Sequence, residues 1–224
     1  MLADIENRNR FAFVRYSDGD WNCFFGRDGG IPNEHAYMPG LGQRLRESVV
    51  PEPGYHVGIM PSLLTPDRWW ASNKVISWLA DRPEMSFCSS LVLHKAGMQG
   101  RLDAYFSAVK GQRRVLISNE SASGMAPWLG DFEHVIIPKQ DCWLQRDEIL
   151  PRIIKACREP GVAMFACSIP AKVWIRQAWD AGCAASLIDI GSVFDPYLGR
   201  LSRNYMRKTG VILAEPLYEV PPCT

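Results

Sequence analysis

Two carboxylates and an arginine follow the first apolar segment of this 224-residue chain. Phe11–Trp21 is FAFVRYSDGDW, so Asp18 and Asp20 come just after a strand-like run, with Arg15 nearby. Carboxylate oxygens are hard ligands that suit Mg²⁺ or Mn²⁺, and such an ion beside an arginine can hold a diphosphate. Asp-Gly is also a very common turn dipeptide, so an ordinary surface turn is the alternative interpretation of this motif alone.

Seven strand-like segments alternate with helical patterns, which predicts an α/β, Rossmann-like fold with a mostly parallel central sheet. Several strands are apolar almost throughout, as expected when helices cover both faces of the sheet. The helical patterns span Pro66–Ala80 with Thr65 as N-cap, Gln99–Val109, Arg146–Arg158 and Pro170–Ala181. The expected strands are Phe11–Tyr16, His56–Met60, Ser86–Leu91, Arg113–Ser118, His134–Pro138, Val162–Ser168 and Ser186–Ile190.

Length and composition favour one ordered domain over residues 1–224, since the chain has no repeat and no low-complexity linker. A hydrophobic fraction of 47% is ordinary for a globular protein, and a net charge of +1 gives no whole-molecule argument for nucleic acid or membrane. The polar start MLADIENRNR resembles no targeting peptide, and no apolar run is long enough to span a bilayer. The 7 cysteines form no CxxC pair, so we expect small buried side chains in a cytoplasmic protein.

Small polar and charged residues follow four of the predicted strands. The carboxyl ends of parallel strands meet at one edge of a sheet, where such sheets bind their ligands. Ser168 also precedes a helix whose first N–H groups could face a phosphate, although Ser168 as an ordinary helix cap is the alternative. Turn, cap and loop roles are likewise the alternatives for the other residues. Besides the first strand end, these residues are Ser118, Asn119, Glu120, Ser168, Lys172, Asp189, Gly191, Ser192 and Asp195.

Several segments together resemble one known family, the GT-D-fold glycosyltransferases. RYSDGDW is similar to the R-[FY]-G-D-G-E signature of that family, and Val115–Asp131 resembles its strand and donor-side loop. Further along the chain, VIIPKQDCW, CSIPAKVWI and LIDIGS resemble its I-x-P-x-x-N-A-F/W, S-x-G-P-x-A-K-V-L and A-I-D-I-G-H/S stretches. The agreement is collinear over most of the chain and is more specific than any single motif.

The resemblance implies a metal-dependent transfer of a sugar from a nucleoside diphosphate donor, with a UDP-sugar favoured. In the family the D-x-E pair binds the metal, and Asp18 and Asp20 occupy those positions here. The chain departs from the signature twice, with Ser17 in place of glycine and Asp20 in place of glutamate. A D-x-D pair remains a workable set of oxygen ligands for Mn²⁺ or Mg²⁺.

Glycosyl transfer requires positive charge near the departing diphosphate and a group that takes the proton of the acceptor hydroxyl. Arg15 and Lys172 are the candidates for the cations. Asp189, Asp195 and His94 are the candidates for the base, and the sequence does not rank them. The predicted contacts to the donor are Arg15, Ser118, Asn119, Glu120, Ser168, Lys172, Gly191 and Ser192.

Two classes of acceptor fit the sequence, a glycan or glycopeptide and phage-type DNA that carries hydroxymethylpyrimidines. In the second case the protein would work in the host cytoplasm. Four cations surround Tyr205 in Arg200–Lys208, and Lys110–Arg114 holds a second basic cluster. Such residues could follow a phosphate backbone, and Trp69 and Trp70 could stack on a flipped base. Solvated basic faces and core tryptophans are the alternative interpretations.

A non-catalytic nucleotide-binding or interaction module on a Rossmann-like sheet is the rival function. A methyltransferase would carry a glycine-rich turn after its first strand, and the chain has no GxGxxG. An inactive relative would more naturally have lost a motif carboxylate. Because Asp18 and Asp20 are both present, the sequence favours an enzyme.

Overall fold

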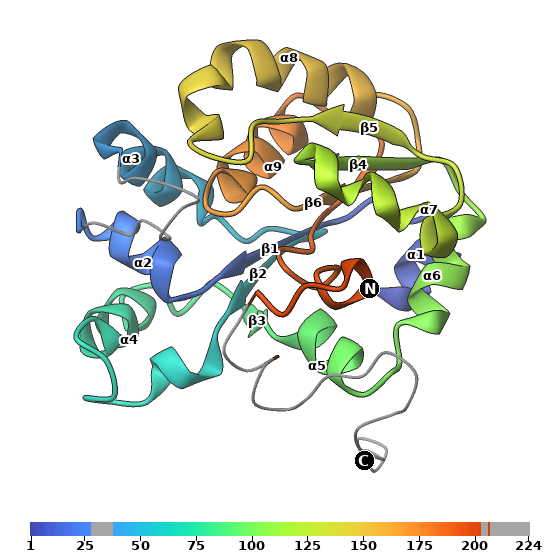
Figure 1. Ribbon diagram of the computed structural model, residues 1–224. Helices are drawn as coiled ribbons and strands as arrows, with labels where there is room; N and C mark the ends of the chain where they lie inside the picture. Colours follow the sequence, from blue (N-terminus) through green and yellow to red (C-terminus); the bar gives the residue numbers. More distant parts are fainter. Residues whose placement is uncertain (28–37, 203–205, 207–224) are drawn as a thin grey trace.

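A seven-stranded sheet forms the centre of the computed structural model, which describes residues 1–27, 38–202 and 206 (Figure 1). Its order is β3-β2-β1-β7-β6-β4-β5, and every neighbouring pair is parallel. All seven predicted strands are confirmed, with ends that shift by a few residues. The strands are β1 (Ala12–Tyr16), β2 (Tyr55–Ile59), β3 (Phe87–Ser89), β4 (Arg114–Ser118), β5 (Glu133–Ile136), β6 (Val162–Phe165) and β7 (Ser186–Asp189).

Helices cover both faces of the sheet, as the apolar strands predict. Along β4, Val115 and Ile117 belong to one buried cluster and Leu116 to a second cluster on the opposite face. Residues from α3, α8 and α9 complete the first cluster, and residues from α1, α5, α6 and α7 complete the second. The helices are α1 (Leu2–Glu6), α2 (Asp18–Phe24), α3 (Pro39–Ser48), α4 (Ser72–Ala80), α5 (Val92–Met98), α6 (Asp103–Lys110), α7 (Ala126–Leu129), α8 (Arg146–Cys157) and α9 (Pro170–Asp180). Short 3₁₀ turns are η1 (Pro61–Leu64), η2 (Glu120–Met125), η3 (Cys142–Gln145) and η4 (Pro196–Leu198).

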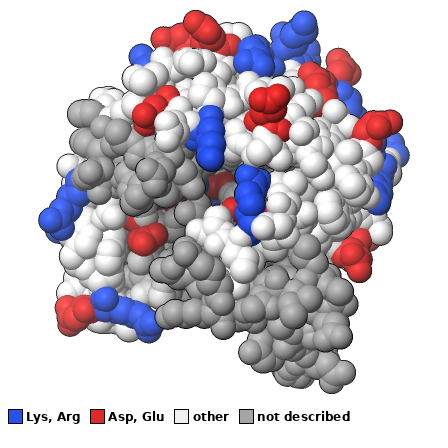
Figure 2. Space-filling view, viewed as in Figure 1, with Lys and Arg blue, Asp and Glu red and all other residues white. Residues whose placement is uncertain are grey.

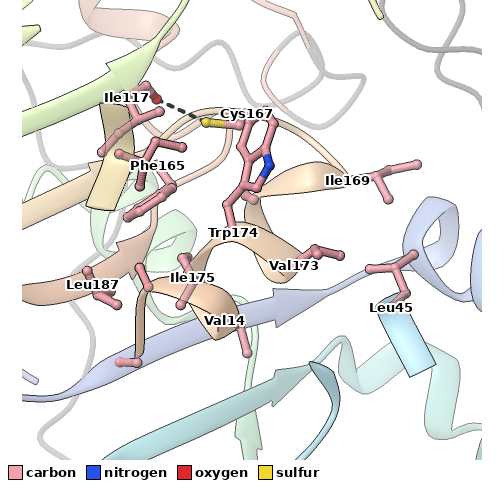
Figure 3. Packing of buried hydrophobic residues seen from close by; sticks show 14 of the residues in the cluster. Val14, Leu45, Ile117, Phe165, Cys167, Ile169, Val173, Trp174, Ile175 and Leu187 are labelled. Carbon is pink, nitrogen blue, oxygen red and sulfur yellow. Dashed lines mark hydrogen bonds between the residues drawn. The ribbon is translucent and has the colours of Figure 1, made fainter. Parts of the chain in front are cut away.

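Helix α9 contributes a buried apolar face to the core next to the site. Val173, Trp174 and Ile175 are buried in the same cluster as Phe165 and Leu187, and in Figure 3 Ile175 lies toward Leu187 whereas Val173 lies on the side of Leu45. Burial of each large apolar side chain contributes about 1.5–3 kcal/mol to folding. The amino end of α9 is therefore held firmly at the carboxyl edge of the sheet.

Two predicted helices begin later than expected. The segment predicted to start at Pro66 becomes α4 only at Ser72, because Thr65 is extended and Asp67 has a φ of 55°. A helix cannot run through a left-handed residue. The pattern at Gln99–Val109 likewise begins at Asp103, since Gly100 has a φ of 64° and separates α5 from α6.

The other two predicted helices are confirmed as α8 and α9, with Pro151 inside α8. Five of the cysteines that the structure describes are buried, and Cys88 is exposed. Within the described ranges, no helix combines the length and apolar character needed to cross a membrane.

Candidate functional site

The Asp-Gly-Asp motif is the first turn of a helix and not the loop that its composition suggests. Helix α2 begins at Asp18, directly after Ser17. Residues two apart on a helix point to different sides, and here Asp18 is exposed whereas Asp20 is 2% exposed. The Asp20 Oδ2 atom accepts hydrogen bonds from Ser17 N at 2.8 Å and Ser17 Oγ at 2.9 Å. Asp20 therefore caps its own helix.

Lys172 lies between two buried carboxylates that come from different parts of the chain. Its Nζ atom is 3.2 Å from Asp20 Oδ1 and 3.0 Å from Asp189 Oδ2. It also donates to the Ser168 carbonyl oxygen at 3.1 Å. Burial opposes the charge of Lys172, but Asp189 and Asp20 overcome that effect and the pKa of Lys172 is raised. The ammonium therefore lies within 3.2 Å of three protein oxygen atoms.

Arg15 extends this buried cluster toward α5. Its backbone N–H donates to Asp189 Oδ2 at 3.4 Å, and its Nε atom lies 3.8 Å from Asp189 Oδ1. Its Nη1 atom donates to the ring of His94, whose Nε2 atom is 3.3 Å from Ser192 Oγ. A guanidinium only donates, so the ring nitrogen that it contacts is an acceptor. The cluster contains two cations and two carboxylates, Arg15, Lys172, Asp20 and Asp189.

Gly191 allows Arg15 to reach its place. Its φ is +50°, and a Cβ atom at this position would lie 2.3 Å from Arg15 Nη2. The turn after β7 thus needs glycine both for its backbone conformation and for space.

A cavity of about 390 Å³ opens beside the cluster. It lies at the carboxyl ends of β4, β6 and β7. Strand β4 connects outward to β5, whereas its neighbour β6 connects in the opposite direction to β7. Parallel sheets bind ligands in the crevice that forms at such a switch point. The predicted residues that line the cavity are Ser118, Asn119, Ser168, Gly191, Ser192 and Asp195.

The other predicted residues lie outside the cavity lining. Glu120 is exposed, Asp18 faces solvent, and Arg15, Lys172 and Asp189 are in the buried cluster. Of the three candidate bases, Asp189 is 0% exposed and His94 is buried against Arg15. Only Asp195 lines the cavity. The structure therefore brings the predicted residues to one edge of the sheet in two adjoining groups.

Three residues of this region escaped the sequence-based selection of site residues. His134 on β5 hydrogen-bonds through Nε2 to Ser118 Oγ at 2.9 Å, and burial lowers the pKa of His134. Lys139 and Arg200 line the cavity and bring positive charge to it. His134 on β5 contacts Ser118 at the end of the neighbouring β4, and pairing across strands is not visible in sequence spacing.

Ser168 does not cap α9 with its side chain, contrary to the alternative interpretation of that residue. Its φ is 56°, and the capping position belongs to Ile169, which makes no side-chain cap bond. The Ser168 Oγ atom is buried and has no hydrogen-bond partner in the described part of the chain. It lines the cavity, where its hydroxyl can donate a hydrogen bond to a ligand.

The basic and aromatic residues that the sequence offers as contacts to DNA lie in separate parts of the protein. Arg113 and Arg114 lie at the amino end of β4, opposite the cavity, and donate to the carbonyl oxygens of Ala156 and Asp131. Trp70 stands beside α2, with the guanidinium of Arg27 4.2 Å from its ring centroid. Residues 203–205 and 207–208 of the other basic segment, with Tyr205, lie outside the described residues.

One exposed carboxylate, Asp18 at the start of α2, could hold a divalent cation. No group of three or more His, Cys, Asp or Glu side chains suited to a metal occurs among the described residues. Asp20 Oδ2 accepts from Ser17, and its Oδ1 atom is buried without a hydrogen-bond partner among the described residues, 3.2 Å from Lys172 Nζ. Asp18 is exposed, and its Oδ1 atom accepts the neighbouring Gly19 N–H at 2.9 Å. Mg²⁺ is commonly held by one or two carboxylates plus waters and substrate phosphates.

The sheet order and the crevice define a doubly wound α/β fold, and solved structures with glycosyltransferase folds share it. No protein-family model and no curated protein matches the chain. A structure of the highly conserved domain of unknown function 1792, described as having a distinct glycosyltransferase fold, matches with a TM-score of 0.67 and 15% identity. The match covers 94% of this chain and 79% of that one.

Two further structures of the same domain also match the fold of this chain. A selenomethionine-substituted one has a TM-score of 0.68 and 15% identity, and covers 94% of this chain and 79% of that one. A new glycosyltransferase from Streptococcus sanguinis has a TM-score of 0.67 and 16% identity, over 94% of this chain and 82% of that one. The α/β fold that the resemblance implied is thereby confirmed.

Proposed function

We propose that this protein is a glycosyltransferase that moves a sugar from a nucleoside diphosphate donor, preferably a UDP-sugar, to an acceptor hydroxyl. The observation that carries the proposal is the cavity at the switch point between β4 and β6, lined by Ser168, Ser192 and Asp195, in a fold shared with glycosyltransferase structures. Asp195 brings an acidic side chain to that cavity, where it can act on an acceptor hydroxyl.

In the proposed reaction the acceptor oxygen attacks the anomeric carbon, the bond from that carbon to the diphosphate breaks, and the nucleoside diphosphate leaves. Asp195 takes the proton of the acceptor hydroxyl, because among the candidate bases it alone lines the cavity. Ser168 and Ser192 offer hydroxyls to the donor from the turns after β6 and β7. Asp189 and Lys172 hold those turns in place through their ion pair.

We propose Asp18 as the protein ligand of a divalent Mn²⁺ or Mg²⁺ ion. When bound, such an ion supplies positive charge for the departing diphosphate. Asp20, the second predicted metal ligand, instead positions Lys172 and the first turn of α2. The two motif carboxylates thus have different roles.

A glycan or glycopeptide is the proposed acceptor. Arg113 and Arg114 lie at the opposite edge of the sheet from the cavity, so they offer no basic track that leads to it. Figure 2 shows acidic and basic side chains interspersed on the viewed face. This arrangement gives little support to DNA as the acceptor, which is therefore kept as one outcome of the test.

The test is a donor-hydrolysis and transfer screen. UDP-glucose, UDP-GlcNAc, UDP-galactose and GDP-mannose are each incubated with Mn²⁺ or Mg²⁺, alone, with a glycopeptide, and with hydroxymethylated DNA. We expect release of a nucleoside diphosphate from one donor, accelerated by the glycopeptide and lost in Asp195→Asn. Acceleration by the DNA alone would overturn the proposed acceptor, and no release from any donor would favour the non-catalytic module.

A further inference from the structure

Two cations at the cavity stand apart from the buried cluster. Lys139 follows β5, and Arg200 follows η4, so they reach the cavity from different connections of the sheet. Lys139 is exposed, and the Arg200 side chain is 37% exposed. Figure 2 shows Lys and Arg side chains beside a central hollow of the viewed face. These two residues are the cations that the cavity lining offers within the described chain.

The buried cations already have protein partners. Lys172 Nζ donates to the Ser168 carbonyl oxygen and forms ion pairs with Asp20 and Asp189, and its side chain is only 5% exposed. Arg15 donates to His94, and its Nε atom, which has no hydrogen-bond partner among the described residues, lies 3.8 Å from Asp189 Oδ1. Neither side chain lines the cavity. A diphosphate in the cavity would have to break a buried ion pair to reach them, which is costly.

Arg200 has contacts that a ligand can replace. Its Nη1 atom donates to Ser121 Oγ at 2.8 Å, and its Nη2 atom is 3.6 Å from Asp195 Oδ1, too long for a hydrogen bond. Its Nε atom is buried and has no hydrogen-bond partner among the described residues. A guanidinium binds phosphate oxygens with two parallel N–H bonds. Lys139 has no ion pair with any other described side chain and adds a second positive charge.

Resting on the proposed function, we propose that Arg200 and Lys139 bind the diphosphate of the donor, and that Arg15 and Lys172 only position the site. With Asp195, the cavity lining carries two cations and one carboxylate, so its charge favours an anion. The Arg200 guanidinium and the Lys139 ammonium would stabilise the negative charge that develops on the leaving diphosphate. If Arg200 moves to the diphosphate, Asp195 Oδ1 is left to accept a proton, while Oδ2 keeps its hydrogen bond from Ser202 Oγ.

The test compares nucleoside diphosphates with their nucleosides by calorimetry in saturating Mg²⁺. For UDP, GDP, CDP and ADP, the affinity of the diphosphate is divided by the affinity of the nucleoside with the same base. This ratio measures how much the two phosphates contribute to binding. We expect Arg200→Gln to reduce that ratio about tenfold, as loss of a charge-assisted bond does. We expect Lys139→Met to reduce it by up to about fivefold, because exposed pairs are weaker. Arg200→Lys should restore part of the loss.

Arg44→Gln and Lys155→Met are the matched controls. Arg44 forms an exposed ion pair with Glu47 on α3, and Lys155 is exposed on α8. Both should leave the ratio unchanged. Thermal unfolding of every variant separates a folding defect from a binding defect, and Lys139→Met removes no protein partner and so should fold normally.

The outcomes distinguish the two proposals. If wild-type protein binds a diphosphate and both cavity variants bind it equally well, the Arg200–Lys139 assignment is wrong while the proposed function stands. If the variants lose diphosphate affinity but the transfer screen shows no activity, the assignment holds and the proposed function fails. If no nucleoside diphosphate binds to wild-type protein, both are overturned.

Discussion

Ser17 Oγ donates a hydrogen bond to Asp20 Oδ2 at 2.9 Å, which joins the two positions where the chain departs from the R-[FY]-G-D-G-E signature. A glycine at position 17 would lack this hydroxyl, and a glutamate at position 20 would extend the carboxylate by one methylene. The two departures therefore act as a pair. Together they hold the Asp20 carboxylate against the start of α2 and toward Lys172.

Ser17→Gly and Asp20→Glu should be non-additive. Asp20→Glu alone adds length to a buried carboxylate that is fixed by Ser17, whereas the double variant restores the signature. We expect a coupling free energy of about 0.5–3 kcal/mol from urea unfolding of the wild type, both single variants and the double variant. Additive effects would show that the two departures are independent.

Asp18→Asn and Asp20→Asn should affect the protein differently. Because Asp18 is exposed and Asp20 is engaged by Ser17 and Lys172, only Asp18→Asn should abolish Mn²⁺ binding in the presence of UDP, measured by electron paramagnetic resonance. Asp20→Asn should keep metal binding but lower the free energy of unfolding by about 1–3 kcal/mol. Asp131→Asn, at an exposed acid in the loop before β5, is the control. Loss of Mn²⁺ in Asp20→Asn alone would reverse our assignment.

Lys172→Met should be strongly destabilising. It leaves Asp20 and Asp189 buried without their shared cation, and removal of one partner from a buried pair costs about 3–5 kcal/mol. The raised pKa of Lys172 also means that this stabilisation is complete at neutral pH and is lost only as the pH rises through that pKa. Urea unfolding at pH 7 measures the loss. Adding Asp20→Asn and Asp189→Asn should recover part of it, which a simple packing defect would not allow.

Gly191→Ala should damage the site more than its backbone cost explains. The added Cβ would meet Arg15 Nη2, so the guanidinium must move. The matched control is Gly182→Ala, where φ is +71° and no atom lies within 4 Å of the added Cβ. The control should lose about 1 kcal/mol from backbone strain alone. Equal losses of unfolding free energy in both variants would remove the steric role of Gly191.

His134 should make stability fall in mild acid. Burial lowers its pKa from 6.5, so the unfolded chain binds the proton first as the pH falls below that value. Stability from this source is therefore present above about pH 6.5 and lost between there and the lowered pKa. Thermal unfolding from pH 7.5 down to pH 5 should show a shallower decline in His134→Gln than in wild type. His56→Gln, at an exposed histidine, should follow the wild type.

The sheet could be predicted because several strands are apolar on both faces, as Val115, Leu116 and Ile117 of β4 illustrate. The sequence also placed Ser168 and Asp195 at the same edge, since parallel strand ends must meet there. It could not reveal that Asp18 and Asp20 face opposite ways, because an Asp-Gly-Asp turn and a helix start have the same composition.

The pairing of Lys172 with Asp20 was also hidden, since it joins α9 to α2 through a buried contact that no local pattern records. For the same reason the sequence predicted that Lys172 contacts the sugar donor, whereas the structure places its ammonium beside Ser168, Asp20 and Asp189. The role of Arg200 depended on the cavity and could be proposed only from the structure.

The triple contact of Lys172 has a consequence for the energetics of turnover. Its ammonium ties the starts of α2 and α9 to the end of β7, so the dipoles of these segments are already oriented before a substrate arrives. Little reorganisation energy is then required as charge shifts during reaction. The binding energy of a substrate can be used for closing the cavity and aligning the acceptor, because the conformational entropy of the buried cluster has been lost during folding.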